Sequence, residues 1–235
     1  MRLRGWVVIV VVALIATTAH AQQATGQLGI ERFRLAVDRA GMLDVEWAGV
    51  PHHLSWGAGV AIGFAHDPLV VYAEDMTAVD ALVEQRLTTS FVGSVALWNR
   101  LQLGAALDIV GYQTGSDVLG TMRALPSGGL GDARLLAKLL LVGDARYQIA
   151  FVPALTVPGG DAEGYLREAG ATLSPGVAAS LVVGRLRVAT NFGYHVKPRV
   201  DTAGLVSDDE AFARIALGVV VGSLRSPVAE LWAST

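Results

Sequence analysis

From Leu54 onward, apolar residues alternate with polar or small ones along most of the chain. Leu101, Leu103, Ala105, Leu107 and Ile109 share one face of their run, and Gln102, Gly104, Ala106 and Asp108 share the other. Successive side chains of a β-strand point to opposite faces, so this two-residue period predicts strands. We expect eight full strands and a ninth beginning at Val228, the eight covering residues 54–66, 80–98, 100–113, 129–142, 146–158, 169–183, 185–197 and 209–222.

Short turns and longer polar loops alternate between these strands. The short turns are expected about 41 to 44 residues apart, at Asn99-Arg100, Gly143-Asp144, Gly184-Arg185 and Arg225-Ser226-Pro227. The loops cover roughly residues 66–80, 114–128, 159–168 and 197–209. Short turns at one end and long loops at the other are typical of an outer-membrane β-barrel. A propeller blade would need four strands per interval, and only two fit.

Strand length and aromatic placement favour a barrel over a soluble sandwich, which also alternates. The predicted strands run about 10 to 13 residues, whereas soluble strands usually have five or six and a spanning strand needs about 9 to 11. Aromatic residues near the strand ends resemble interfacial girdles: Trp56, Trp98 and Tyr147 at the short turns, Tyr112, Phe192 and Tyr194 toward the loops. We predict an all-β, antiparallel, up-and-down transmembrane β-barrel.

The amino terminus has the three parts of a secretory signal peptide. Arg2 and Arg4 precede an apolar stretch from Trp6 to Ala16, and Ala19-His20-Ala21 offers small residues for cleavage after Ala21. The stretch is shorter than the roughly 20 apolar residues of a spanning helix. We expect residues 1–21 to be a cleaved signal peptide and residues 54–235 to form the barrel. Residues 22–53 lack strands of membrane length and are a periplasmic lead-in, a plug or an extra edge strand.

The predicted strand count does not close a barrel. Bacterial single-chain barrels have an even number of strands, and an open edge in lipid would leave backbone groups unpaired. Either eight strands close and the last residues are a tail, or the chain is an amino-terminal fragment of a longer barrel. We favour the fragment, because Val228–Trp232 alternates like the start of a strand.

Charged residues on the inward faces are the candidate functional residues. The set comprises Arg86, Asp108, Asp132, Arg134, Lys138, Arg187 and Arg214. In a narrow barrel, whose interior is filled by side chains, they would pair as a structural network. In a wider barrel they would line a pore, and their excess of cations would favour anions.

Little else in the composition points to chemistry. The net charge of −3 without a charge block gives no reason to expect a nucleic-acid partner, and the absence of cysteine excludes disulfides and thiol chemistry. His52-His53, His66-Asp67 and the acidic run 208–210 fit interfacial or solvated features better than metal sites. Ser90, Ser94, Ser174 and Ser180 have no histidine at a spacing typical of a hydrolase. We expect no catalytic residues, metal or cofactor.

Two stretches resemble known outer-membrane families. Gly129-Leu130-Gly131-Asp132 and Pro153-Ala154-Leu155-Thr156-Val157-Pro158-Gly159-Gly160 resemble the transporter-like barrels of meta-pathway phenol degradation. The order Phe33, Leu43-Asp44-Val45, Trp56, Asp67-Pro68-Leu69-Val70 and Leu173-Ser174-Pro175 resembles the barrel half of certain OmpA-family proteins. In those proteins a peptidoglycan-binding domain follows the barrel, and this sequence does not contain one.

The resemblance implies transport or an envelope structure, and it identifies no ligand. We expect a passive pore or small-molecule transporter in the outer membrane of a Gram-negative bacterium; the alternative is a structural or anchoring envelope barrel. The expected partners are outer-membrane lipid, the barrel-assembly machinery and small solutes.

Overall fold

The structure, a computed structural model, describes residues 28–38, 40–72, 78–116, 124–160, 164–202, 205–221 and 224–234. The predicted signal peptide lies outside these residues. The described chain is all-β, and none of its segments is a helix long and apolar enough to cross a membrane.

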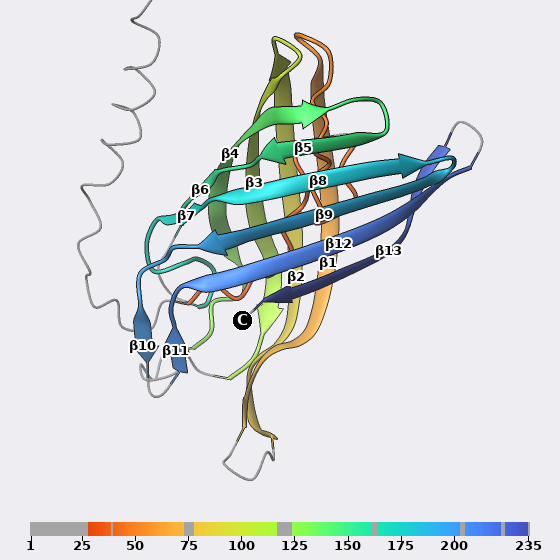
Figure 1. The fold of residues 1–235 in the computed structure, drawn as a ribbon. Helices are drawn as coiled ribbons and strands as arrows, with labels where there is room; N and C mark the ends of the chain where they lie inside the picture. The colour runs from red at the N-terminus through yellow and green to blue at the C-terminus, as the bar shows by residue number, and fades with distance from the viewer. Residues whose placement is uncertain are drawn as a thin grey trace, which may run out of the picture.

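One curled antiparallel sheet makes up most of the molecule (Figure 1). Its strands follow the order β1-β2-β3-β4-β5-β8-β9-β12-β13, so neighbours in the sheet are also neighbours in the chain. The short β6 continues the path of β5 beside β4, and β7 pairs with β6. The strands of the sheet are β1 (Trp56–Tyr72), β2 (Ala78–Leu97), β3 (Leu101–Thr114), β4 (Gly129–Gly143), β5 (Tyr147–Phe151), β6 (Ala154–Val157), β7 (Thr172–Ser174), β8 (Gly176–Val183), β9 (Leu186–His195), β12 (Glu210–Val221) and β13 (Leu224–Ser234).

The prediction of an all-β, antiparallel, up-and-down fold is confirmed. Each of the eight predicted full strands is present, and two of them are interrupted by prolines. Pro153 separates β5 from β6, and Pro175 separates β7 from β8. Because proline has no backbone N–H, it removes one hydrogen bond of the ladder without ending the run.

Three predicted connections differ from the structure. The loop expected at 66–80 is shorter, because β1 continues to Tyr72 past an irregular register at His66–Leu69, where Asp67 has φ 50°. The loop expected at 197–209 contains a small hairpin of β10 (Val200–Thr202) and β11 (Leu205–Ser207).

The predicted turn at Arg225-Ser226-Pro227 is wrong. These three residues belong to β13 and pair with Val220, Val219 and Gly218 of β12. A register shift between Leu217 and Gly218 leaves Val228 as an extra residue beside Pro227, which lets the strand accommodate a residue without an N–H. The ninth strand therefore begins at Leu224 rather than Val228.

The curled sheet forms a half-barrel. Strands β1 and β13 lie at the two ends of the sheet path and do not pair with each other over the described residues. The short connections are tight: at the β2–β3 turn, Arg100 N–H donates to the Leu97 carbonyl at 3.2 Å, with Trp98 and Asn99 both in the left-handed region. This is the arrangement of a two-residue hairpin turn.

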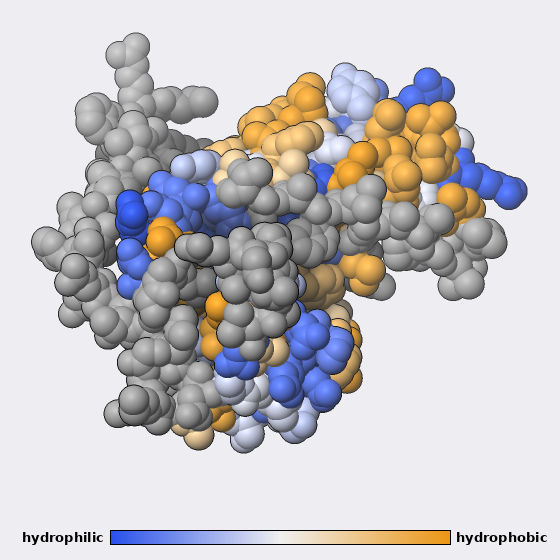
Figure 2. Space-filling view, turned by 90° about the horizontal axis from the view of Figure 1, so that it is seen from below, coloured by the Kyte–Doolittle hydropathy of each residue, from blue (hydrophilic) through white to orange (hydrophobic). Residues whose placement is uncertain are grey.

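The two faces of the half-barrel differ in chemistry. The outward positions carry large apolar side chains that are half or more exposed, such as Ile62, Phe64 and Leu135. Apolar side chains form continuous areas of the surface in Figure 2. The inward positions carry buried polar and charged residues. Residues 28–38 and 40–53, which we call the inner segment, lie along this inward face, between β2–β4 and β9–β12 (Figure 1).

Candidate functional site in the barrel interior

The structure places all seven predicted lumen charges on the inward face, in contact with the inner segment or with neighbouring wall residues. Lys138, Arg86 and Arg187 are almost inaccessible to solvent, at 0%, 2% and 8% exposure. Asp108, Asp132, Arg134 and Arg214 are partly buried. All seven side chains therefore lie on the side of the sheet that also contacts the inner segment.

The inner segment folds locally into a small irregular hairpin. Ala36 N–H donates to the Leu43 carbonyl at 2.6 Å, and Met42 and Val45 form an antiparallel bridge. The carboxylate of Asp38 accepts the N–H of Ala40 at 2.7 Å and closes the turn, as aspartate commonly does. Apolar residues of this hairpin pack on small residues of the wall, for example Met42 and Val45 near Ala189 and Ala216.

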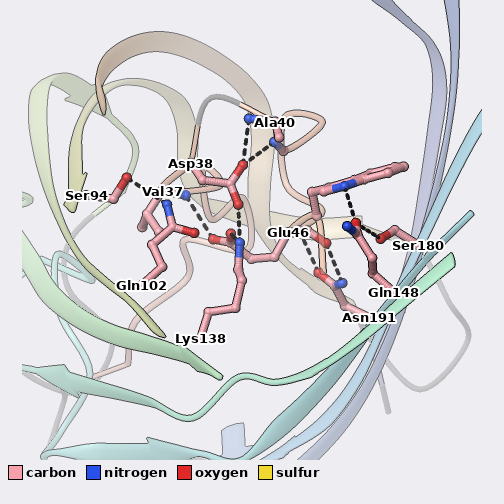
Figure 3. Close-up of polar contacts among 12 residues, drawn as sticks. Val37, Asp38, Ala40, Glu46, Ser94, Gln102, Lys138, Gln148, Ser180 and Asn191 are labelled. Carbon is pink, nitrogen blue, oxygen red and sulfur yellow. Dashed lines mark hydrogen bonds and ion pairs between the residues drawn. The ribbon is translucent and has the colours of Figure 1, made fainter. Parts of the chain in front are cut away.

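A buried ion-pair triad joins the inner segment to the wall (Figure 3). The Nζ atom of Lys138, on β4, contacts Asp38 and lies 3.0 Å from Oε2 of Glu46. The other oxygen of Glu46 accepts the Val37 N–H at 2.8 Å. Although burial by itself raises the pKa of Glu46, Lys138 and Arg134 bring it below its usual value. Lys138 is thus the cation that two buried carboxylates of the inner segment share.

Polar side chains of β5 and β9 hold the residues that follow. Asn191 accepts the Glu46 N–H at 2.8 Å and donates to the Glu46 carbonyl at 2.9 Å, which imitates a strand partner for an otherwise unpaired backbone (Figure 3). Trp47 donates its indole N–H to Gln148 at 2.9 Å, and the Arg187 guanidinium lies 4.1 Å from the centre of a Trp47 ring.

A second ion pair lies toward β12. Arg214 Nε is 3.2 Å from Oδ2 of Asp44, whose other oxygen accepts the Arg34 N–H at 2.9 Å. Burial raises the pKa of Asp44 to about 6, against the attraction of Arg214. Here too, a carboxylate of the inner segment meets a cation of the wall.

The remaining predicted charges lie nearer the loop end. Arg86 donates to Gln113 at 2.8 Å and to the Tyr165 carbonyl at 2.7 Å, so it joins the wall to the loop after β6. Asp108 accepts the Ser90 hydroxyl, and Asp132 accepts the Glu168 N–H at 3.1 Å. Arg134 donates to the Leu35 carbonyl of the inner segment.

The functional residues that the sequence analysis missed are the acids of the inner segment: Glu31, Asp38, Asp44 and Glu46. The wall has more cations than acids among its predicted lumen charges, and these four residues supply the opposite sign. Two signals were available in the sequence. Asp44 and Glu46 are two residues apart and thus share a face. The excess of cations among the predicted lumen charges also indicates acidic partners elsewhere in the chain.

The six predicted girdle aromatics are all exposed at the surface, between 44% and 73%. Trp56 begins β1, Trp98 lies in the β2–β3 turn, and Tyr147 begins β5, so these three share the short-turn end. Tyr112, Phe192 and Tyr194 lie toward the opposite ends of β3 and β9. The two sets therefore lie toward opposite ends of the strands.

Ser174 lies beside a histidine, contrary to the sequence analysis. Its hydroxyl is 2.6 Å from Nδ1 of His195, and both residues are buried on the inward face. Phe212 stacks on the His195 ring at 4.5 Å. The two residues were overlooked because β8 separates them in sequence, whereas an isolated bridge between Leu173 and Val196 brings their strand ends together.

Of the histidines and acids in 52–53, 66–67 and 208–210, His53 and Glu210 have clear structural partners. His53 accepts the Trp98 N–H at 3.1 Å and so stabilises a turn. Glu210 pairs with Arg32 at 2.6 Å and with Lys197 at 3.2 Å. Within the described ranges, no group of three or more histidine, aspartate or glutamate side chains is arranged to hold a metal ion.

Comparison with known proteins adds no identity to this geometry. No family model, no curated protein and no solved structure matches the chain.

Proposed function

We propose that this chain is an outer-membrane β-barrel protein that transports small solutes, with the inner segment closing the interior at rest. In this proposal the signal peptide exports the chain, the barrel-assembly machinery inserts it, and outer-membrane lipid surrounds it.

The observation that carries the proposal is the inverted distribution of side chains. Large apolar residues are exposed on the outward face, while lysine, arginine, aspartate and glutamate are buried on the inward face. A water-soluble sheet protein hides its apolar face in a core. A sheet with an apolar outside and a polar inside is suited to lipid around it and water or polar groups within it.

The inner segment supports a closed resting state rather than a permanently open pore. It is held by the Lys138 triad, by the Asp44–Arg214 pair and by the two Asn191 hydrogen bonds. Hydrogen bonds from Arg134 and Arg187 add to these contacts, and Met42 and Val45 pack on the wall. Water can take the place of the polar partners when the segment moves. Movement of the segment would expose the cations of the wall and open a passage for solutes.

A charge scan along β4 tests the membrane setting. Leu135 is in the middle of β4 and 53% exposed, and Leu141 is near the short-turn end and also 53% exposed. The six-residue interval is about 20 Å along the strand, or roughly 15 Å in depth at barrel tilt. In bilayers, Leu135→Arg should lower the free energy of unfolding by about 2–4 kcal/mol, and Leu141→Arg should lower it by about 0–1 kcal/mol. Equal, near-zero costs for both would contradict a lipid-facing wall.

Solute flux tests the transport part. Liposomes with the folded wild-type protein should take up small labelled solutes faster than empty liposomes, and a variant lacking residues 28–53 should do so faster still. If the inserted wild type gives no flux above empty liposomes, transport is wrong. The second candidate, a structural envelope barrel, is favoured by one observation: each predicted lumen charge already has a protein partner in the described chain.

A further inference from the structure

A polar cavity lies between the inner segment and the inward faces of β2, β3, β4 and β6. Arg34, Arg134, Thr156, Asp108, Asp132 and Glu168 are among the residues that line it. Lys138, Asp38 and Glu46 are not part of the lining, so the cavity is separate from the buried triad that holds the segment in place.

Two arginines in this cavity have most of their hydrogen-bonding capacity unused. A guanidinium group carries five N–H donors. Among the described residues, the Arg134 side chain donates only to the Leu35 carbonyl, and the Arg34 guanidinium makes no hydrogen bond, although the carboxylates of Glu168 and Asp44 attract it. Neither guanidinium has a described carboxylate within ion-pair distance. Burial, together with the nearby Arg134 and Arg214, lowers the pKa of Arg34 to about 10.

A third group points to the same ligand. Thr156 is directly opposite Arg134 in the β4–β6 pairing and therefore lies beside it on the inward face. Its hydroxyl is buried and has no hydrogen-bond partner among the described residues. Buried polar groups without partners are costly, so a ligand or water that fills this position gains hydrogen bonds that the protein does not supply.

We propose that this cavity binds the carboxylate group of a small monocarboxylate solute, with Arg34 and Arg134 as the charged donors and Thr156 as a neutral one. A planar guanidinium matches a carboxylate with two parallel hydrogen bonds, so two such groups can hold one carboxylate from two sides. Ala106, the β3 partner of Arg134, leaves space beside the arginine on the wall.

The acids of the cavity select a single negative charge. Glu31, Asp108, Asp132 and Glu168 line it together with Arg34, Arg86 and Arg134, so four formal negative charges stand beside three positive ones. A doubly charged phosphate would meet these carboxylates at short range, whereas a monocarboxylate brings one charge between two arginines. Binding at this site does not depend on whether the solute crosses the membrane.

Equilibrium dialysis of radiolabelled acetate against the folded full chain in detergent tests the inference. We expect saturable acetate binding that acetamide, its neutral counterpart, does not displace. Arg34→Gln should weaken binding about tenfold or more, because hydrogen bonds to charged groups are the strong ones, and Thr156→Val should weaken it about threefold. The control is Arg146→Gln, at an exposed turn position where the described hydrogen bonds involve the backbone N–H and carbonyl, and it should bind as the wild type does.

Each alternative result is decisive. No saturable acetate binding, tighter binding of inorganic phosphate, or displacement by acetamide would overturn the proposal. Equal loss in Arg34→Gln and Arg146→Gln would also overturn it, since binding would then depend on net charge. Because the Arg34 guanidinium makes no ion pair with a described residue, its replacement should leave the circular dichroism spectrum unchanged, and that spectrum checks that the variant is folded. A silent flux assay leaves this binding measurement unaffected.

Discussion

Replacement of Lys138 by methionine should release the inner segment from the wall. Lys138 is inaccessible to solvent and is shared by Asp38 and Glu46. At the 3.0 Å separation of Lys138 and Glu46, and with an effective dielectric constant of about 20, the attraction is about 5–6 kcal/mol. The cost of burying the charges offsets much of it, so the intact triad contributes little net stability.

Removal of the cation alone leaves two buried carboxylates facing each other. Loss of one partner of a buried pair typically costs about 3–5 kcal/mol, because the remaining charge is uncompensated. We expect a loss of this size in Lys138→Met, confined at first to the docking of the inner segment. Methionine has nearly the length of lysine, so the space is not emptied.

Hydrogen exchange of the protein in lipid vesicles is the appropriate measurement, since it reports the opening free energy of each segment. The opening free energy of residues 36–47 should fall by about 3–5 kcal/mol in Lys138→Met, while amides of β8 and β9 away from the segment change little. A triple variant that adds Asp38→Asn and Glu46→Gln should recover most of the loss, because no unpaired charge remains. The reasoning is refuted if Lys138→Met loses less than about 1 kcal/mol, or if the triple variant is no better than the single one.

Three further predictions concern the same interior. Gly104→Ala should weaken docking of the inner segment by about 1–3 kcal/mol by overpacking, because the added Cβ would be 2.5 Å from Cγ2 of Val37. In hydrogen exchange, adding Val37→Ala to the same chain should restore the lost protection, and no restoration would argue against the contact. Asn191→Ala should cost about 1–3 kcal/mol, since it leaves the Glu46 N–H and carbonyl without partners; unchanged protection at residue 46 would contradict it. Burial raises the folded-state pKa of Asp44 to about 6 from 3.8, so its contribution to the free energy of unfolding is fully present below about pH 4 and is lost as pH rises through 6. Urea titrations across this range should show a decline in the free energy of unfolding of the wild type that Asp44→Asn lacks. The opposite slope would show that the shift has the wrong sign.

Most of the wall could be predicted from the sequence because the two-residue period sorts each strand into an apolar and a polar face. The Pro227 region shows where this reasoning fails. The sequence pattern predicts a turn at Pro227, but proline also fits a strand next to a register irregularity, as in the β12–β13 pairing. Local pattern does not distinguish these two uses of the same residue.

The site was only half predictable, for a physical reason. Wall charges are fixed by strand periodicity, so the inward position of Lys138 and Arg214 could be predicted. Their partners Glu46 and Asp44 share one face of a short run, but nothing in that run states whether this face meets the wall or the solvent. The plug was one of three alternatives for residues 22–53, and only the contacts of the described part, 28–38 and 40–53, place it along the inward face.

The inner segment also has a consequence for the order of assembly. Asp38 meets its partner 100 residues later in the chain, and Glu46 meets Asn191 145 residues later. Contacts at such separations form late, because the intervening chain must first be ordered. A stretch made early in synthesis therefore waits for almost the entire wall before it can dock. Until then its acids and the cations of the wall stay hydrated. We therefore expect desolvation of these charges to be the last folding step.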